Sequence, residues 1–166
     1  RVPCFMLPLY ILPLYLQTEY KNETKRVMSK PYVIGLDLGG TNSVFGIVDK
    51  DANIVESVSV KTGKDAPESY LARCVEALTH LLEQVGGVEK LQGMGIGAPN
   101  GNIYSGMVER AANLPWEGNV PLAKMFSEAL GVPVVVTNDA NAAAIGEMKY
   151  GAARGMKDFI RITLGT

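Results

Sequence analysis

Three strand-like runs joined by short turns do most to limit the fold of this chain. The runs cover residues 32–38, 43–48 and 54–60, and turn-forming Gly, Asn and Asp residues occupy the gaps between them. Strand runs separated by such short gaps pair as hairpins. The sequence therefore predicts an antiparallel meander at the start of a sheet.

Helices and strands alternate after this meander. Asp65 and Glu68 have the spacing of a capping box, with a carboxylate as the cap, ahead of a run whose apolar residues recur at helical spacing. We expect that helix to end at the glycine pair Gly86 and Gly87. A short buried strand is predicted at 94–98, followed by a loop rich in Asn, Gly and Pro over 99–119.

The same alternation continues to the end of the chain. A second helix is predicted from Pro121 to Gly131, then a strand over 133–139, an alanine-rich helix over 140–151 and a final strand over 158–166. Strands that alternate with helices imply parallel pairing. Together with the meander, this predicts an α/β fold with a mixed sheet and flanking helices.

Composition limits the class of protein. The sequence has 47% hydrophobic and 20% charged residues and a net charge of -1, which is typical of a soluble globular protein. The charge gives no support for a nucleic-acid partner or a membrane surface. Cys4 and Cys74 form neither a disulfide framework nor a zinc site by themselves. We therefore expect a reducing, cytoplasmic setting.

The first 30 residues differ from the rest. An apolar run carries Pro3, Pro8 and Pro13, and it is too short and too interrupted for a spanning helix. The residues from Met28 onward read like a natural start. We expect residues 1–30 to be foreign to the domain or an extension of it; an anchor that faces a membrane is a further alternative.

Two familiar site patterns fail in context. Residues 93–98 match a dinucleotide-binding glycine pattern, but Pro99 follows, and no helix begins there to meet a pyrophosphate. His80 is the only histidine and lies off the apolar face of its helix, so we interpret it as a solvated surface residue. A catalytic triad around it has no support.

The stretch GLDLGGTN, residues 35–42, is the first candidate site. Asp37 places a carboxylate inside an apolar strand, which is costly without a partner. One interpretation is an ordinary hairpin turn. The other is that Gly39 and Gly40 bring amides to a phosphate, that Thr41 and Asn42 add side-chain donors, and that Asp37 holds a hydrated Mg²⁺.

The stretch VTNDANAAAIGE is the second candidate site. One interpretation makes Asp139 only the N-cap of the following helix. The other places it at the carboxyl end of a strand, where open α/β sheets bind ligands and where its carboxylate could accept a proton from an alcohol. Asn138 would then hydrogen-bond the same substrate.

The polar loop after the strand at 94–98 is the third candidate. Asn100, Gly101 and Asn113 could line a pocket for a hydroxyl-rich ligand. Trp116 fits a packing role better than a sugar-stacking role.

The motifs together resemble a known family. GLDLGGTN, GIGAPNG, NLPW, NDANAAAIGE and ITLGT stand in the order seen in the ROK family, whose members include bacterial glucokinases. The resemblance covers residues 32–166. It implies an actin-like, ribonuclease-H-like fold of two lobes, with residues 31–150 as the N-terminal lobe and 151–166 as the first strand of a C-terminal lobe that is cut off. It also implies transfer of the γ-phosphoryl group of ATP to a hexose.

The resemblance assigns roles to the candidate residues. Asp139 matches the catalytic base and Asn138 its sugar-binding neighbour. ATP and Mg²⁺ would meet the first phosphate motif and the start of a second one, which here comprise Asp37, Gly39, Gly40, Thr41, Asn42, Gly165 and Thr166.

Some family features are absent from the sequence. The cysteine-rich structural Zn²⁺ site and a sugar-contacting His and Glu would follow Thr166, and Ala112 stands where proline is common. We therefore expect the full-length parent to be a kinase and this chain to be inactive or nearly so alone. A homo-oligomer of the parent is left open, since family members are often dimers or tetramers.

Glucose is the first candidate substrate, with mannose, fructose, allose or an N-acetylated hexosamine left open. Two other functions remain as alternatives. The family also contains sugar-sensing transcriptional regulators, although residues 1–31 are too short and proline-interrupted for a helix-turn-helix segment. The second alternative function is a non-catalytic sugar-binding module. The presence of both Asp37 and Asp139 argues against it.

Overall fold

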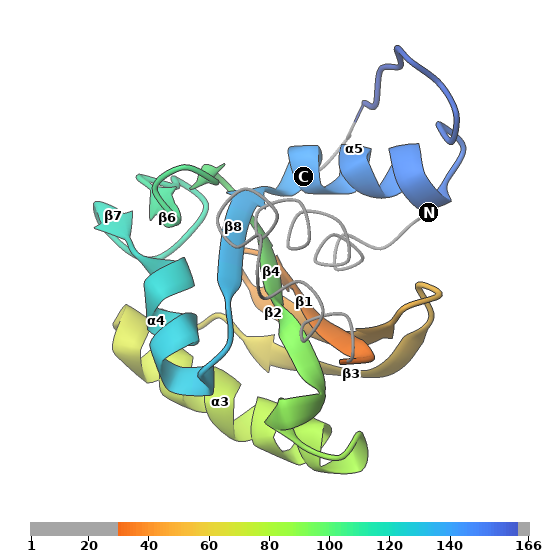
Figure 1. Cartoon of the computed structure of the whole chain (residues 1–166). Coiled ribbons are helices and arrows are strands. Elements are labelled where there is room, and N and C mark those ends of the chain that lie inside the picture. The colour runs from red at the N-terminus through yellow and green to blue at the C-terminus, as the bar shows by residue number, and fades with distance from the viewer. Residues whose placement is uncertain (1–29, 163–166) are drawn as a thin grey trace.

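The computed structural model describes residues 30–162 of the chain, and Figure 1 shows their arrangement. The main sheet has the strand order β3-β2-β1-β4-β8. Its strands are β1 (Tyr32–Leu38), β2 (Asn42–Asp49), β3 (Ile54–Lys61), β4 (Leu91–Ala98) and β8 (Val134–Asn138). Of the helices between residues 30 and 162, α3 (Pro67–Gln84), α4 (Leu122–Leu130) and α5 (Asp139–Tyr150) pack on this sheet.

The predicted meander and mixed sheet are both confirmed. Strand β2 pairs antiparallel with β1 and with β3, and the first hairpin closes where Leu38 lies opposite Ser43. Strands β1, β4 and β8 run parallel to one another. Because parallel neighbours need crossover connections, helices separate these strands in the sequence.

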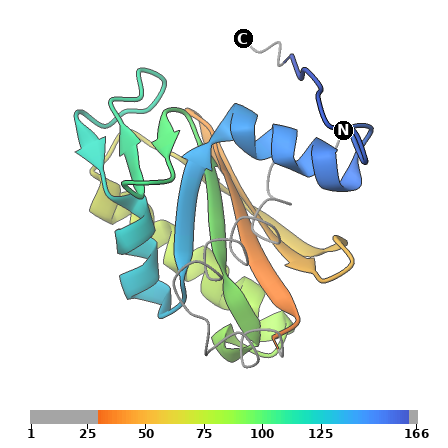
Figure 2. The same cartoon turned by 45° about the horizontal axis from the view of Figure 1, so that its top comes forward.

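The helices cover the two faces of the sheet. Helices α3 and α4 lie on one face and α5 on the other, as Figures 1 and 2 show. The core between the sheet and α3 and α4 contains Phe45, Tyr70 and Phe126, all fully buried. The Phe45 and Phe126 ring centroids are 6.2 Å apart, and the Tyr70 and Phe126 centroids 6.5 Å apart. The first pair is tilted and the second is edge-to-face, and such aromatic contacts add to the stabilisation that burial provides.

The first helix begins differently from the prediction. Its N-cap is Ala66, without a side-chain cap, and Pro67 is its first residue, so the capping box of Asp65 and Glu68 is wrong. Asp65 instead accepts a hydrogen bond from Nη1 of Arg73, which lowers the pKa of the Asp65 carboxyl. Proline fits this first position because its missing N–H has no partner in a helix start.

The predicted loop over 99–119 contains a second small sheet. It has the order β5-β6-β7, formed by β5 (Gly101–Asn102), β6 (Met107–Glu109) and β7 (Asn119–Val120). Strands of only two or three residues carry no clear alternation of apolar and polar side chains.

The final predicted strand is wrong for its described part. Residues 158–162 are in no strand, and the side chains of Ile160 and Ile162 are 90% and 77% exposed. A strand forms by pairing with a neighbour, and none of the strands within 30–162 pairs with this segment. The rest of the prediction, residues 163–166, lies outside the described residues.

The remaining predictions on single residues can be compared directly. His80 has a side chain that is 78% exposed, which confirms a surface position. Helix α4 ends at Gly131 in the left-handed conformation, as predicted. Cys74 is a buried free thiol. Among the helices of the described part of the chain, none is long and apolar enough to cross a membrane.

Candidate functional site

The parallel strands bring the predicted acidic residues to one edge of the sheet. Asp37 of β1 lies opposite Gly97 of β4, and Gly97 lies opposite Thr137 of β8. Asp139 follows β8 and begins α5. Since neighbouring strands lie about 4.8 Å apart, Asp37 and the end of β8 are separated by about 10 Å. The structure therefore places Asp37 and Asp139 at the same carboxyl edge, both half-buried.

The Gly39–Asn42 turn joins β1 to β2 at this edge. Gly39 does not offer its amide to a ligand, because this N–H donates to the carbonyl of Asn42 at 3.1 Å. That part of the prediction for Gly39 is wrong. Gly40, Thr41 and Asn42 are exposed, and the amides of Gly40 and Thr41 have no acceptor among residues 30–162. Within the described part of the chain, these two N–H groups are therefore available to a ligand.

A close contact with the backbone of Asn113 explains why Gly40 is a glycine. A Cβ at Gly40 would lie 2.4 Å from the carbonyl oxygen of Asn113. No atom of this kind can be accommodated without moving one of the two segments. Asn113 is therefore packed against the turn through its backbone.

On its other side the turn is held by Thr62. The amide of Thr62 donates to the carbonyl of Thr41 at 2.9 Å, and its hydroxyl donates to the carbonyl of Gly39 at 2.6 Å. Thr62 is fully buried and directly follows β3.

The end of β8 carries the second polar pair. Asn138 is the N-cap of α5, and its Oδ1 accepts from the amides of Ala140 at 3.0 Å and Asn141 at 3.2 Å. The amide of Ala140 also donates to Oδ1 of Asp139, at 2.8 Å. The cap is therefore Asn138, and Asp139 is the first helical residue.

A polar hollow of about 460 Å³ adjoins this edge. Asn100 and Gly101 line it, as predicted. Asn113, Asn138 and Asp139 are not among its lining residues, although Thr137 and Asn141, on either side of the last two, are. The other lining residues are Asn102, Ile103, Tyr104 and Glu109.

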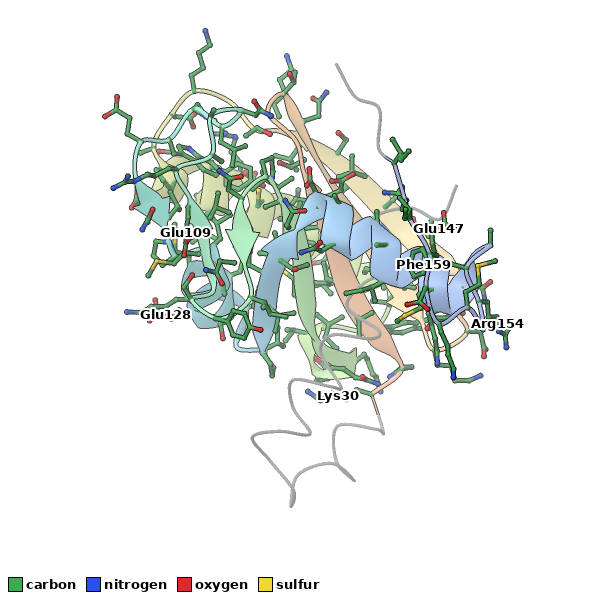
Figure 3. The ribbon with its side chains drawn as sticks, turned by 90° about the horizontal axis from the view of Figure 1, so that it is seen from above. Lys30, Glu109, Glu128, Glu147, Arg154 and Phe159 are labelled. Carbon is green, nitrogen blue, oxygen red and sulfur yellow. The ribbon has the colours of Figure 1, made fainter. Side chains whose placement is uncertain are left out.

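Glu109 orders one wall of the hollow, and sequence reasoning missed it. Its Oε1 accepts from Nδ2 of Asn102 at 3.0 Å and from the hydroxyl of Ser105 at 2.8 Å. Figure 3 shows Glu109 on the side of the molecule away from Glu147 and Phe159, which lie near the C-terminal end of α5. Polar residues at short spacing on both sides of a Tyr-Ser-Gly turn were the only available signal.

Two observations explain the conformation of the wall next to the sheet. Asn100 has a positive φ of 52°, and its Nδ2 donates to the carbonyls of Glu109 at 3.1 Å and Arg110 at 3.3 Å. A Cβ at Gly101 would lie 2.3 Å from the carbonyl oxygen of Thr137, so only glycine fits there.

The residues at this edge suit a metal ion that keeps most of its waters. The described residues contain no group of three or more His, Cys, Asp or Glu side chains that could enclose a metal. Mg²⁺ in phosphate-binding sites needs only one or two carboxylates beside the phosphates, and Asp37 can supply one. Gly165 and Thr166, predicted to contact the nucleotide, lie outside the described residues.

Trp116 packs against the core, which confirms the packing interpretation. It is 7% exposed, and its ring centroid lies 5.0 Å from that of Tyr70. Its Nε1 donates to the carbonyl of Asp65 at 3.0 Å. The loop that carries Asn113 is thereby tied to the turn between β3 and α3.

Comparison with known proteins finds a glucokinase and a xylose repressor among the relatives of this chain. The glucokinase of Streptomyces coelicolor is 39% identical over 134 residues, which are 80% of this chain and 40% of that protein. The xylose repressor of Caldicellulosiruptor bescii is 32% identical over 139 residues, 80% of this chain and 34% of that protein. This chain therefore spans less than half of the length of either relative.

Solved structures agree with the sequence relatives. The crystal structure of a ROK family glucokinase from Streptomyces griseus, in complex with glucose and AMPPNP, is similar with a TM-score of 0.64. The similarity extends over 75% of this chain and 38% of that one, at 34% sequence identity. The actin-like, ribonuclease-H-like mixed sheet with flanking helices is thereby confirmed. The model of the ROK family matches residues 33–166, and the chain belongs to the ROK family.

Proposed function

We propose that the full product of this gene transfers the γ-phosphoryl group of ATP to a hexose, with glucose as the first candidate. The observation that carries the proposal is the placement of Asp37, the Gly39–Asn42 turn and Asp139 at one carboxyl edge of the sheet. The similarity to glucokinases, one of them solved with glucose and AMPPNP, supports this assignment. A cytoplasmic location belongs to the same proposal.

In this proposal the turn between β1 and β2 binds the phosphates. The free amides of Gly40 and Thr41 donate to phosphate oxygens, and the side chains of Thr41 and Asn42 add donors. Asp37 holds the waters of Mg²⁺, which when bound offsets the negative charge of the phosphates. A second phosphate contact comes from Gly165 and Thr166.

The hexose occupies the polar hollow. Asn100 accepts from a sugar hydroxyl through its side-chain oxygen, Gly101 lines the site, and Nδ2 of Asn138 donates to the same sugar. Asn113 closes the site from the side of the turn. One hydroxyl is held beside the Asp139 carboxylate.

The chemical step then needs a positioned base. The hydroxyl oxygen attacks the γ-phosphorus of ATP, the bond from that phosphorus to the bridging oxygen breaks, and ADP leaves. The hydroxyl proton passes to the carboxylate of Asp139. Positioning and charge stabilisation account for most of such catalysis.

Part of the site belongs to a second lobe in this proposal. Residues 31–150 form the first lobe, and residues 151–166 begin the second lobe. A structural Zn²⁺ site would belong to the rest of that second lobe. The highly exposed side chains of Ile160 and Ile162 support a role in packing against such a lobe. This chain alone is accordingly expected to show little or no turnover.

The test is a hexose-dependent assay of ADP formation with the full gene product. Glucose, mannose, fructose, allose and N-acetylated hexosamines are compared as acceptors. Asp139→Asn is expected to lower kcat by about 10²- to 10⁴-fold while the dissociation constant of the sugar stays unchanged. An unchanged kcat in this variant would overturn the role of Asp139.

A sugar-sensing regulator is the second candidate, because a xylose repressor is among the relatives. A regulator would bind the sugar, form no ADP in its presence, and change its affinity for DNA when the sugar binds. A non-catalytic sugar-binding module would bind the sugar and do neither. These outcomes separate the three functions within one set of measurements.

A further inference from the structure

Three buried hydroxyl groups form a chain that leads from α3 to the Gly39–Asn42 turn. The hydroxyl of Tyr70 donates to Oγ of Ser43 at 2.8 Å, and Oγ of Ser43 lies 3.0 Å from Oγ1 of Thr62. Oγ1 of Thr62 donates to the carbonyl of Gly39 at 2.6 Å. The side chains of Tyr70, Ser43 and Thr62 are all fully buried.

The direction of every hydrogen bond in this chain is determined. Thr62 has a single hydroxyl proton, which it gives to Gly39, so Ser43 must be the donor to Thr62. Tyr70 in turn donates to Ser43. Burial raises the pKa of Tyr70, so the phenol keeps the proton that begins the chain. A one-way chain of this kind fixes each hydroxyl rotor.

The chain ends on the peptide that shapes the turn. Since Gly39 gives its amide to Asn42 and its carbonyl to Thr62, both of its polar backbone groups are committed. Thr62 also donates its own amide to the carbonyl of Thr41. With the carbonyl of Gly39 held toward the buried side, the Gly40 amide of the same trans peptide is turned to the opposite, exposed side.

We propose that Thr62, Ser43 and Tyr70 are positioning residues that hold the Gly39–Asn42 turn in its nucleotide-binding conformation. This inference rests on the proposed function of the turn. All three side chains are fully buried and reach no ligand directly, and each acts through the carbonyl of Gly39. Their removal is expected to weaken nucleotide binding while leaving the hexose hollow unchanged.

The main variant is Thr62→Val, which keeps the shape and removes the hydroxyl. In the full gene product it is expected to raise the KM for ATP by about fivefold or more, with the KM for the hexose changed less than about twofold. Thr62→Ser restores the hydroxyl and is expected to bring the KM for ATP back to within about twofold of the original. A merely structural role would shift both KM values or neither.

Thr79→Val is the matched control. It also removes a threonine hydroxyl, but one that donates to the carbonyl of Val75 within α3, on the exposed side of the helix. Tyr70→Phe breaks the chain at its far end by the loss of one oxygen, and it carries the test if Thr62→Val does not fold. Equal effects on both substrates, or no effect of Thr62→Val and Tyr70→Phe, would overturn the inference.

Failure of the kinase proposal can be told apart from failure of this one. If the unmodified gene product forms no ADP with any hexose, the kinase proposal fails. The turn is then tested by hydrogen exchange at the amides of Gly40 and Thr41 in Thr62→Val and Thr62→Ser, and by calorimetric titration with AMPPNP and Mg²⁺. Exchange and titration that do not differ between these variants contradict the positioning role.

Discussion

Asp37 and Asp139 emerge from the same edge of the sheet, with only β4 between the strands that deliver them. Asp37 interrupts a strand whose neighbours Leu36 and Leu38 are buried in the core, so its side chain leaves the sheet on the opposite face. Asp139 begins a helix that contacts β4 and β8 (Figure 2). A ligand that spans about two interstrand spacings, about 10 Å, can therefore meet one carboxylate at each end.

We predict that Asp37→Asn weakens binding of nucleotide only when Mg²⁺ is present. The amide keeps the shape of the side chain but loses the charge that holds metal-bound water. The affinity for AMPPNP with Mg²⁺ is expected to fall by about tenfold, since hydrogen bonds to charged groups are worth about 1.5–3 kcal/mol. Calorimetric titration with Mg²⁺ and with EDTA measures both affinities.

Asp51→Asn is the control for this substitution. Asp51 lies in the turn between β2 and β3, and its side chain is 63% exposed. It is expected to leave both affinities unchanged. An equal loss of affinity in Asp37→Asn with Mg²⁺ and with EDTA would contradict the metal assignment.

A second prediction concerns the contact between Gly40 and Asn113. Gly40→Ala places a methyl group where the carbonyl oxygen of Asn113 now lies 2.4 Å away. The turn and the loop must then separate, and we expect the free energy of unfolding to fall by about 1–3 kcal/mol. Chemical denaturation followed by circular dichroism measures this change.

Thr41→Ala is the comparison for that experiment. It alters the same exposed turn without adding an atom near Asn113, so little change in stability is expected. If Gly40→Ala were as stable as Thr41→Ala, the close contact would not be what requires glycine at this position.

Sequence patterns predicted the main sheet because its strands are long enough to show them. The hydrophobic residues of β1 and β8 and the glycine that ends α4 give signals within a few residues of their own positions. The start of α3 was mispredicted because Asp65 has a partner eight residues away, Arg73, that competes with capping. The strand expected at 158–162 depends on a partner strand that local sequence cannot reveal.

Only those residues of the candidate site that belong to a recognisable sequence motif were predicted. Asn100 and Gly101 do line the hollow, but Glu109 and Asn141 reach it from β6 and α5, and no spacing in the sequence joins these segments. The buried chain from Tyr70 to Gly39 likewise links residues from α3, β2 and the end of β3. Such convergence depends on tertiary packing, which periodicity does not encode.

A third prediction separates packing from sugar stacking at Trp116. Trp116→Phe keeps an aromatic ring beside Tyr70 but removes the hydrogen bond from Nε1 to the carbonyl of Asp65. The free energy of unfolding is expected to fall by about 1–2 kcal/mol, while the affinity for hexose stays the same. Thermal denaturation and calorimetric titration with glucose measure the two quantities. A large loss of glucose affinity at unchanged stability would instead place this ring against the sugar.

The last prediction concerns stability at alkaline pH. Burial raises the pKa of the Cys74 thiol from 9.0 to about 11, so the folded state keeps this thiol neutral. Above about pH 9 the unfolded state ionises its thiol and the folded state does not. Below pH 9 the thiol is neutral in both states, so its ionisation is expected to leave the free energy of unfolding unchanged. This free energy should fall between about pH 9 and pH 11, by at most about 1.4 kcal/mol per pH unit.

Cys74→Ala isolates this contribution. The smaller side chain lowers stability by an amount that does not depend on pH, whereas the phenol of Tyr70, whose pKa is also raised by burial, titrates in both proteins. Urea denaturation at a series of pH values should therefore give a shallower alkaline decline in Cys74→Ala than in the original chain. Parallel declines in the two proteins would mean that the thiol ionises as easily in the folded state as in the unfolded one, and the thiol would then react with iodoacetamide at pH 9 without prior unfolding.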